Sequence, residues 1–187
     1  SRVDAGVSFI ADAASGLEAE LFLGRSTRIE GDPVFEVGSG LVEDGSDWVA
    51  EIEVNFGDWR VETRNRIDAE DGDLNRTDLR ALGQVWRVGM SAVYTRFGDD
   101  EVVREVREQL NTRFSYDINK RWSLEYGALV DLDEDVLRRQ QAALVYRDEC
   151  TDVRLVYERD TFQVGAIGPS ENLTVRVTLF TLGGVGQ

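Results

Sequence analysis

The feature that most constrains the fold is a strict two-residue alternation in the last extended run, residues 172–182. One side of this run is aliphatic (Leu173, Val175, Val177 and Leu179), and the other side carries Thr174, Arg176, Thr178 and Phe180. Successive side chains of a β-strand point to opposite faces, so the pattern predicts a strand with one apolar face.

The same alternation recurs along most of the chain. It is cleanest at residues 48–56, where Trp48, Ala50, Ile52, Val54 and Phe56 alternate with Glu51, Glu53 and Asn55. Gly57-Asp58 then reads as a two-residue hairpin turn, and we place a second one at Gln84-Val85, before a strand that starts at Trp86. About eleven such runs, most of about ten residues, predict an all-β antiparallel meander over residues 1–187, as one continuous unit without helices.

Composition narrows the classes of function. The chain has 187 residues, a net charge of −15 and no histidine. Acidity argues against a nucleic-acid partner, because a phosphate backbone needs a basic surface. Without histidine, Ser-His-Asp and Cys-His catalysis are excluded and the commonest metal ligand is missing. We therefore expect no enzymatic activity, no metal and no cofactor.

The cysteine content and the apolar runs limit the covalent and membrane possibilities. Cys150 is the only cysteine, so no disulfide can form within the chain. No stretch approaches 18 consecutive apolar residues, so no transmembrane helix is expected. The chain begins at Ser1, and we expect it to be a piece of something longer or a processed product.

Two kinds of β protein share this alternation: a soluble sandwich or barrel, and a transmembrane barrel. Three features favour the membrane barrel. A tilted strand of about 9–11 residues can cross a bilayer. Tight turns alternate with longer, mostly acidic loops, as in outer-membrane barrels. Aromatic residues gather at the tight turns, which suits an interfacial girdle and equally suits plain strand-end packing. These aromatic residues are Phe56, Trp59, Trp86, Tyr116 and Trp122.

Four polar residues argue against a lipid-facing stripe. Arg104 and Glu108 share the apolar side of their strand, and so do Arg138 and Gln140 of a later strand. An arginine on the lipid face costs about 2–4 kcal/mol at the midplane and about 0–1 kcal/mol near the interface. Both arginines lie close to the longer loops, where the cost is small, but Glu108 is not explained in this way.

Two segments resemble a known family. The run YRDECTDVRLVYERD followed by GPSENLTVRVTLFTLGG, within residues 146–184, is similar to the C-terminal end of the LptD family of outer-membrane lipopolysaccharide-assembly proteins. The run SGLVEDGSDWVAEIEV, residues 39–54, resembles an extracellular loop of that family entering a strand. Similarity is weaker at residues 1–27. The family barrel is far larger, and its N-terminal periplasmic domain has no counterpart in this sequence.

The resemblance implies an orientation and a location. The chain would be the C-terminal part of a barrel in the Gram-negative outer membrane, with tight turns in the periplasm and acidic loops outside. Cys150 would then be a disulfide candidate, paired with a cysteine of the periplasmic domain. Many family members have two adjacent cysteines where this chain has one, and the alternative is a lone, inert thiol.

The last strand has a specific role in the family, where it forms a seam that opens sideways to let lipid pass. The seam, or lateral-gate, residues would be Leu173, Val175, Arg176, Val177 and Leu179. Two alternatives for this strand are a recognition signal for the barrel-insertion machinery and an ordinary closing strand.

The charged side of the strands would line the lumen. The predicted lumen-lining residues are Glu51, Glu53, Arg60, Glu62, Arg64, Arg66, Arg107, Arg113, Glu125, Arg154, Glu158 and Arg176. In a soluble protein the same residues would be plain solvated charges. By resemblance, the partners would be lipopolysaccharide, outer-membrane lipid, an LptE-like plug lipoprotein and the periplasmic bridge protein.

Two other functions stay open on the sequence. One is a self-contained small outer-membrane barrel acting as a pore or scaffold, and the other is a soluble acidic β-barrel that binds an apolar ligand. Single-chain bacterial barrels have even strand numbers, so an odd count would disfavour the small barrel.

Overall fold

A computed structural model describes residues 1–30, 45–98, 108–161 and 168–180 of the chain, and these residues contain strands and no helix. The strands are β1 (Arg2–Asp12), β2 (Leu17–Arg28), β3 (Trp48–Phe56), β4 (Trp59–Ile67), β5 (Leu74–Val85), β6 (Val88–Phe97), β7 (Glu108–Asp117), β8 (Trp122–Asp131), β9 (Val136–Arg147), β10 (Thr151–Asp160) and β11 (Ser170–Leu179).

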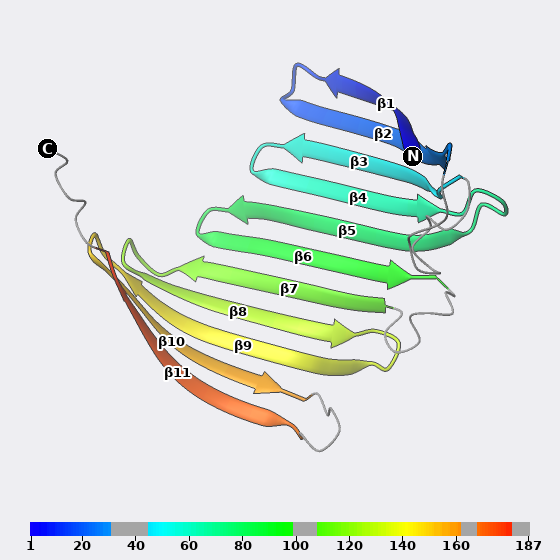
Figure 1. The fold of residues 1–187 in the computed structure, drawn as a ribbon. Coiled ribbons are helices and arrows are strands. Elements are labelled where there is room, and N and C mark those ends of the chain that lie inside the picture. The colour runs from blue at the N-terminus through cyan, green and yellow to red at the C-terminus, as the bar shows by residue number, and fades with distance from the viewer. Residues whose placement is uncertain (31–44, 99–107, 162–167, 181–187) are drawn as a thin grey trace, which may run out of the picture. The chain divides into compact units, whose positions relative to one another are not determined.

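The eleven strands form one antiparallel sheet in strict chain order, from β1 to β11, as Figure 1 shows. The predicted all-β meander is confirmed. β1 and β11 each have a single neighbour in this order, so the described sheet has two edges and is not closed. The chain divides into two compact units, one made of residues 1–83 and 92–110 and the other of residues 84–91 and 111–187.

In the first unit, the register separates an apolar face from a polar face. Leu21 lies opposite Ile52 of β3, and Ile52 lies opposite Thr63 of β4. One position along, Glu51 lies opposite Arg64 on the other face. Because every pair in the ladder keeps this parity, the charged side chains of β3 and β4 share one face with Glu18 and Glu20 of β2, whereas Arg25 of β2 lies over Trp48 on the apolar face.

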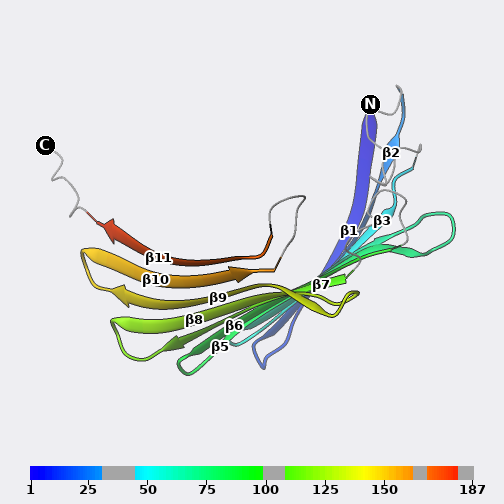
Figure 2. The same cartoon turned by 90° about the horizontal axis from the view of Figure 1, so that it is seen from below.

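The second unit repeats this division over β8 to β11. Leu124 pairs with Leu144, Leu144 with Leu155, and Leu155 with Val175, which makes one apolar row across four strands. Glu125 and Arg154 belong to the opposite face. Figure 2 shows β9, β10 and β11 side by side in one curved layer.

The hairpin at Gly57-Asp58 forms as predicted, and Gly57 has a φ of 56°, which glycine adopts without steric cost. The second hairpin turn was placed wrongly at Gln84-Val85. β5 runs through Val85, and Trp86 and Arg87 form the turn. Trp86 takes a φ of 55°. Its ring centroid lies 6.4 Å from the Tyr116 ring centroid and 5.0 Å from Cζ of Arg87. A positive φ is unusual for a bulky residue such as Trp86.

Burial in this sheet is inverted relative to a soluble protein. The buried described residues include Asp131, Asp152, Ser46 and Thr95, which are all polar. The buried hydrophobic residues are Ala143 and Val145, and both lie on the face that carries Glu125 and Arg154. Large apolar side chains of the opposite face are exposed along most strands.

Candidate functional site

The polar face of the first unit is held together by ion pairs between neighbouring strands. Arg64 of β4 binds Glu51 of β3 through two nitrogens, with Nε and Nη2 both about 3 Å from the carboxylate oxygens (3.0 and 2.9 Å). Arg64 also lies 3.8 Å from Glu62 on its own strand. The paired side chains leave the face with alternating, locally neutralised charge rather than a free anionic surface.

Other charges on this face are paired in the same way. Arg60 binds Glu53 at 2.5 Å. Arg76 binds Asp78 at 2.7 Å, and Thr95 donates to Asp78 at 3.0 Å. Sequence analysis did not name Asp78, although it lies two positions from Arg76 and Arg80 and the same alternation places it among them.

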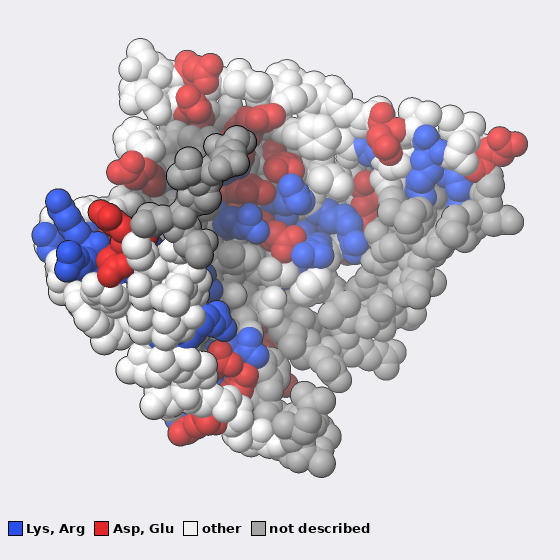
Figure 3. Space-filling view, turned by 60° about the vertical axis from the view of Figure 1, so that its left-hand side comes forward, with Lys and Arg blue, Asp and Glu red and all other residues white. Residues whose placement is uncertain are grey.

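In the second unit, Arg154 of β10 bridges two carboxylates. Its nitrogens lie 3.3 Å from Glu125 of β8 and 3.2 Å from Asp152 of its own strand. Arg147 of β9 also binds Asp152, at 2.9 Å. Figure 3 shows basic and acidic side chains next to one another rather than in separate patches.

Among the described residues, the most buried charge is Asp131, at the end of β8, whose side chain is 1% exposed. Arg138 binds it through Nε and Nη2, at 3.1 and 2.9 Å, and the backbone N–H of Glu134 donates to it at 3.1 Å. Sequence alternation had placed Arg138 on the apolar side, but a register shift after Leu129 brings Leu137 opposite Val130 instead. This bulge turns Arg138 to the polar face, which corrects the sequence-based placement.

The apolar face presents exposed aliphatic and aromatic side chains. Leu155 is 41% exposed and Val175 is 64% exposed. Glu108, which the sequence left unexplained on this side, lies 3.4 Å from Arg96. Arg96 therefore compensates the negative charge of Glu108. The pair lies at the longer-loop end of β6 and β7. Arg104 lies outside the described residues.

The structure brings most of the predicted lumen residues onto one face in each unit. In the first unit the ladder places six of them together: Glu51, Glu53, Arg60, Glu62, Arg64 and Arg66. In the second unit Glu125, Arg154, Glu158 and Arg176 share a face. Arg113 is exposed on β7, and Arg107 lies outside the described residues.

The last strand, β11, pairs with β10 alone. All five predicted seam residues, Leu173, Val175, Arg176, Val177 and Leu179, are exposed. Cys150 is an exposed free thiol in the turn between β9 and β10. Its predicted disulfide with another part of a longer protein stays a prediction.

The acidic turns use their carboxylates to fix their own backbone. Asp68 accepts from the N–H groups of Glu70 and Asp71, at 2.7 and 3.3 Å, and these bonds hold its pKa below the usual range. Asp148 accepts from the N–H of Cys150 at 3.0 Å, which is the main cause of its lowered pKa. Within the described part of the chain, no cluster of His, Cys, Asp or Glu side chains could hold a metal ion.

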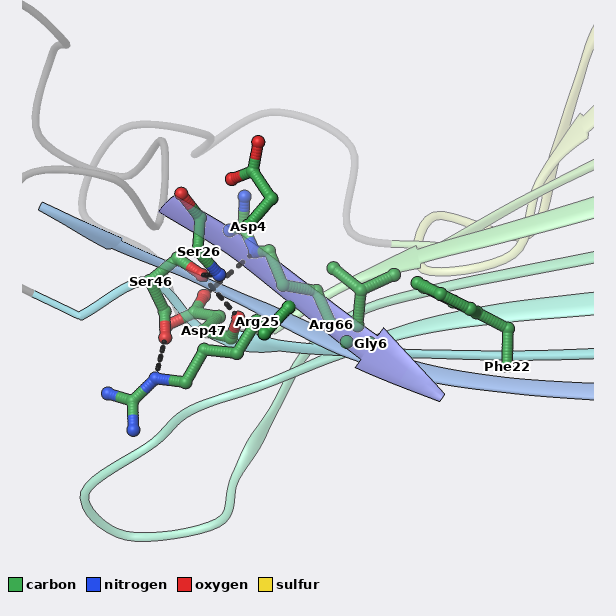
Figure 4. Close-up of a pocket in the computed structure, with 11 residues that line it drawn as sticks. Asp4, Gly6, Phe22, Arg25, Ser26, Ser46, Asp47 and Arg66 are labelled. Atoms are coloured by element: carbon green, nitrogen blue, oxygen red, sulfur yellow. Dashed lines mark hydrogen bonds and ion pairs between the residues drawn. The ribbon is translucent and has the colours of Figure 1, made fainter. Parts of the chain in front are cut away.

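A hollow of about 460 Å³ lies on the polar face of the first unit, at the loop ends of β1 to β4 (Figure 4). Gly6 and Gly24 lie opposite each other in its floor, and the Phe22 ring lies over both. Arg66 borders the hollow and binds Asp47 at 3.1 Å. Neither Asp47 nor this apolar floor was singled out in the sequence analysis.

Comparison with known proteins adds no identification. No protein-family model matches the chain. No curated protein matches it either. Among the described residues, none belongs to a helix long and apolar enough to cross a membrane.

Proposed function

We propose that this chain is part of the wall of a transmembrane β-barrel, with its apolar face toward lipid and its polar face toward a wet lumen. The observation that carries the proposal is the inverted burial. Asp131 and Asp152 are among the most enclosed described side chains, whereas Leu155 and Val175 are open on the opposite face. Transmembrane barrels have this arrangement, because lipid rather than a second protein layer covers the apolar side.

The soluble alternative would require a covering layer over the apolar face, because a sheet with one apolar face must bury it. The row formed by Leu124, Leu144, Leu155 and Val175 crosses four strands. The exposure of Leu124, Leu155 and Val175 supports a face that lipid covers. This exposure disfavours the soluble barrel that binds an apolar ligand.

The strand number favours a larger barrel over a self-contained one. In an antiparallel meander, alternate strands run in the same direction, so β1 and β11 of this sheet run the same way. If β1 and β11 paired directly to close the sheet, they would form a parallel pair. Closed single-chain bacterial barrels are antiparallel and have even strand numbers. The eleven described strands therefore suit a segment that needs further strands.

We assign this segment to a lipopolysaccharide translocon of the Gram-negative outer membrane on the resemblance of residues 39–54 and 146–184 to the LptD family. In such a barrel, the sugars and phosphates of lipopolysaccharide pass along the polar face and an LptE-like plug lies against it. Paired carboxylates, such as Glu51 with Arg64 and Glu125 with Arg154, repel a polyanionic lipid less than free carboxylates would.

A cysteine scan in β10 tests the membrane assignment. In a Cys150→Ser background, single cysteines replace Arg154, Leu155, Val156 and Tyr157, and the whole barrel of which we propose this chain forms part is inserted into vesicles. We expect a membrane-impermeant maleimide to label positions 154 and 156, but not 155 and 157, because only the first two face the lumen. Folding without lipid, with all four positions labelled, would refute the assignment.

A photoreactive residue tests the substrate class. Placed at position 154 in cells that make lipopolysaccharide, it should crosslink to that lipid, whereas the matched residue at position 155 should crosslink to phospholipid. If both positions gave phospholipid alone, the barrel assignment would stand and the lipopolysaccharide assignment would fail.

A further inference from the structure

Charge is distributed unequally between the connections at the two ends of the strands. The described connections at the longer-loop end carry acidic side chains and no Lys or Arg, as in residues 68–73 and 132–135. The cations of the described connections are Arg87, Lys120 and Arg121, which lie in tight turns of the second unit. These three cations are therefore concentrated at one end of β6, β7 and β8.

Backbone contacts tie these turns to one another. Arg87 donates from Nη1 to the carbonyl of Ile118 at 3.0 Å, and its own carbonyl accepts from the N–H of Asp117 at 2.9 Å. The carbonyl of Arg121 accepts from the N–H of Arg147 at 2.8 Å. The turns at 86–87, 118–121 and 148–150 thus form one continuous edge of the second unit.

A hollow of about 720 Å³ lies between the last two of these turns, bordered by Lys120, Arg121 and Arg147. Asp148 and Glu149 border it as well. Asp148 accepts from two backbone N–H groups and from the Tyr146 hydroxyl, at 3.0, 2.9 and 3.0 Å.

Arg147 binds Asp152 at 2.9 Å, and Lys120 and Arg121 border the hollow beside Asp148 and Glu149. The turns at 86–87, 118–121 and 148–150 together carry three cations against the two carboxylates of Asp148 and Glu149, so this edge has a small excess of positive charge.

Aromatic rings border the same edge on the apolar face. Trp122 and Tyr146 form a cross-strand pair with ring centroids 5.0 Å apart, on the same face as Leu124 and Leu144. Trp86 and Tyr116 form a second pair at 6.4 Å. Rings of this kind, with an apolar body and a polar tip, favour the headgroup level of a bilayer.

We propose that this basic–aromatic rim (Trp86, Arg87, Tyr116, Lys120, Arg121 and Trp122) binds the phosphodiester headgroups of anionic phospholipids in the leaflet at the tight-turn end. The proposal rests on the proposed function, because it needs the strands to span a bilayer. The cations supply the charge that a phosphodiester requires. The adjacent aromatic rings favour a lipid over a free phosphate.

The test uses the whole barrel of which we propose this chain forms part, in vesicles of phosphatidylcholine with or without a minor fraction of phosphatidylglycerol. Protease protection in phosphatidylcholine alone reports insertion, and native mass spectrometry after mild extraction reports which lipids stay bound. We expect the wild type to retain phosphatidylglycerol preferentially. The double variant Lys120→Gln/Arg121→Gln should reduce this preference by about fivefold for each charge removed.

The matched control is Arg139→Gln/Arg159→Gln, which removes two cations from the opposite ends of β9 and β10 and should leave the preference unchanged. A charge-keeping variant, Lys120→Arg/Arg121→Lys, should restore it. High salt should weaken the wild-type preference, because surface charges are screened.

Three outcomes would overturn the rim site: equal lipid preference in the two double variants, no preference in the wild type, or displacement of phosphatidylglycerol by inorganic phosphate. Loss of protease protection in pure phosphatidylcholine would instead overturn the proposed function.

Discussion

Leu155→Arg is the sharpest test of the proposal that the apolar face meets lipid. Leu155 lies in the apolar row with Leu144 and Val175. Two residues earlier in β10, Val153 pairs with Tyr146, which forms the aromatic pair with Trp122. At a rise of about 3.3 Å per residue and a tilt of about 40°, the side chain lies about 5 Å below that aromatic level. An arginine at this depth should cost about 2 kcal/mol, between the midplane and interface values.

The matched control is Val156→Arg, one position along the same strand on the polar face. We expect it to cost about 0–1 kcal/mol, because the new side chain reaches water. Urea unfolding of both variants in phosphatidylcholine vesicles, followed by tryptophan fluorescence, measures the two free energies of unfolding. Equal costs, or a larger cost for Val156→Arg, would refute the assignment of the faces.

Three further changes test the energetics of the fold. Arg138→Gln leaves the enclosed Asp131 carboxylate without its guanidinium and should lower the free energy of unfolding by about 2 kcal/mol. The neighbouring Arg139→Gln, whose side chain is 50% exposed, should lower it by less than about 1 kcal/mol, and equal losses would contradict a role for burial. Because the folded-state pKa of Asp68 is lowered, its carboxylate stabilises the fold above the unfolded-state pKa of about 3.9, and this stability is lost as pH falls through the folded pKa. Asp68→Asn should therefore lower the urea midpoint at pH 6 and lower it progressively less as the pH falls below about 3.9, whereas a loss that stays unchanged over this range would oppose this account. Gly57→Val should cost at least about 1–2 kcal/mol, because φ is 56° there, and a neutral result in urea titration would show that the turn rearranges.

Period-two alternation was sufficient to predict the sheet and most of the polar face. It separated Glu51 from Ile52 and Arg154 from Leu155 without any knowledge of the fold, because strand parity is a local property of the backbone. The acidic partners were less visible. Asp78 was overlooked in a weakly patterned run, and the contact between Glu125 and Arg154 joins residues that lie 29 positions apart in the sequence.

The sequence by itself determined the all-β class, the order of the strands and the side of each strand that carries charge, because these follow from neighbouring residues and short turns. Only the tertiary structure decided the bulge that turns Arg138 toward Asp131, the position of Trp86 in a hairpin turn, and the neighbouring tight turns that gather Arg87, Lys120 and Arg121. These features depend on the register between strands. Register is fixed by contacts across the whole length of each pair, which no single stretch of sequence encodes.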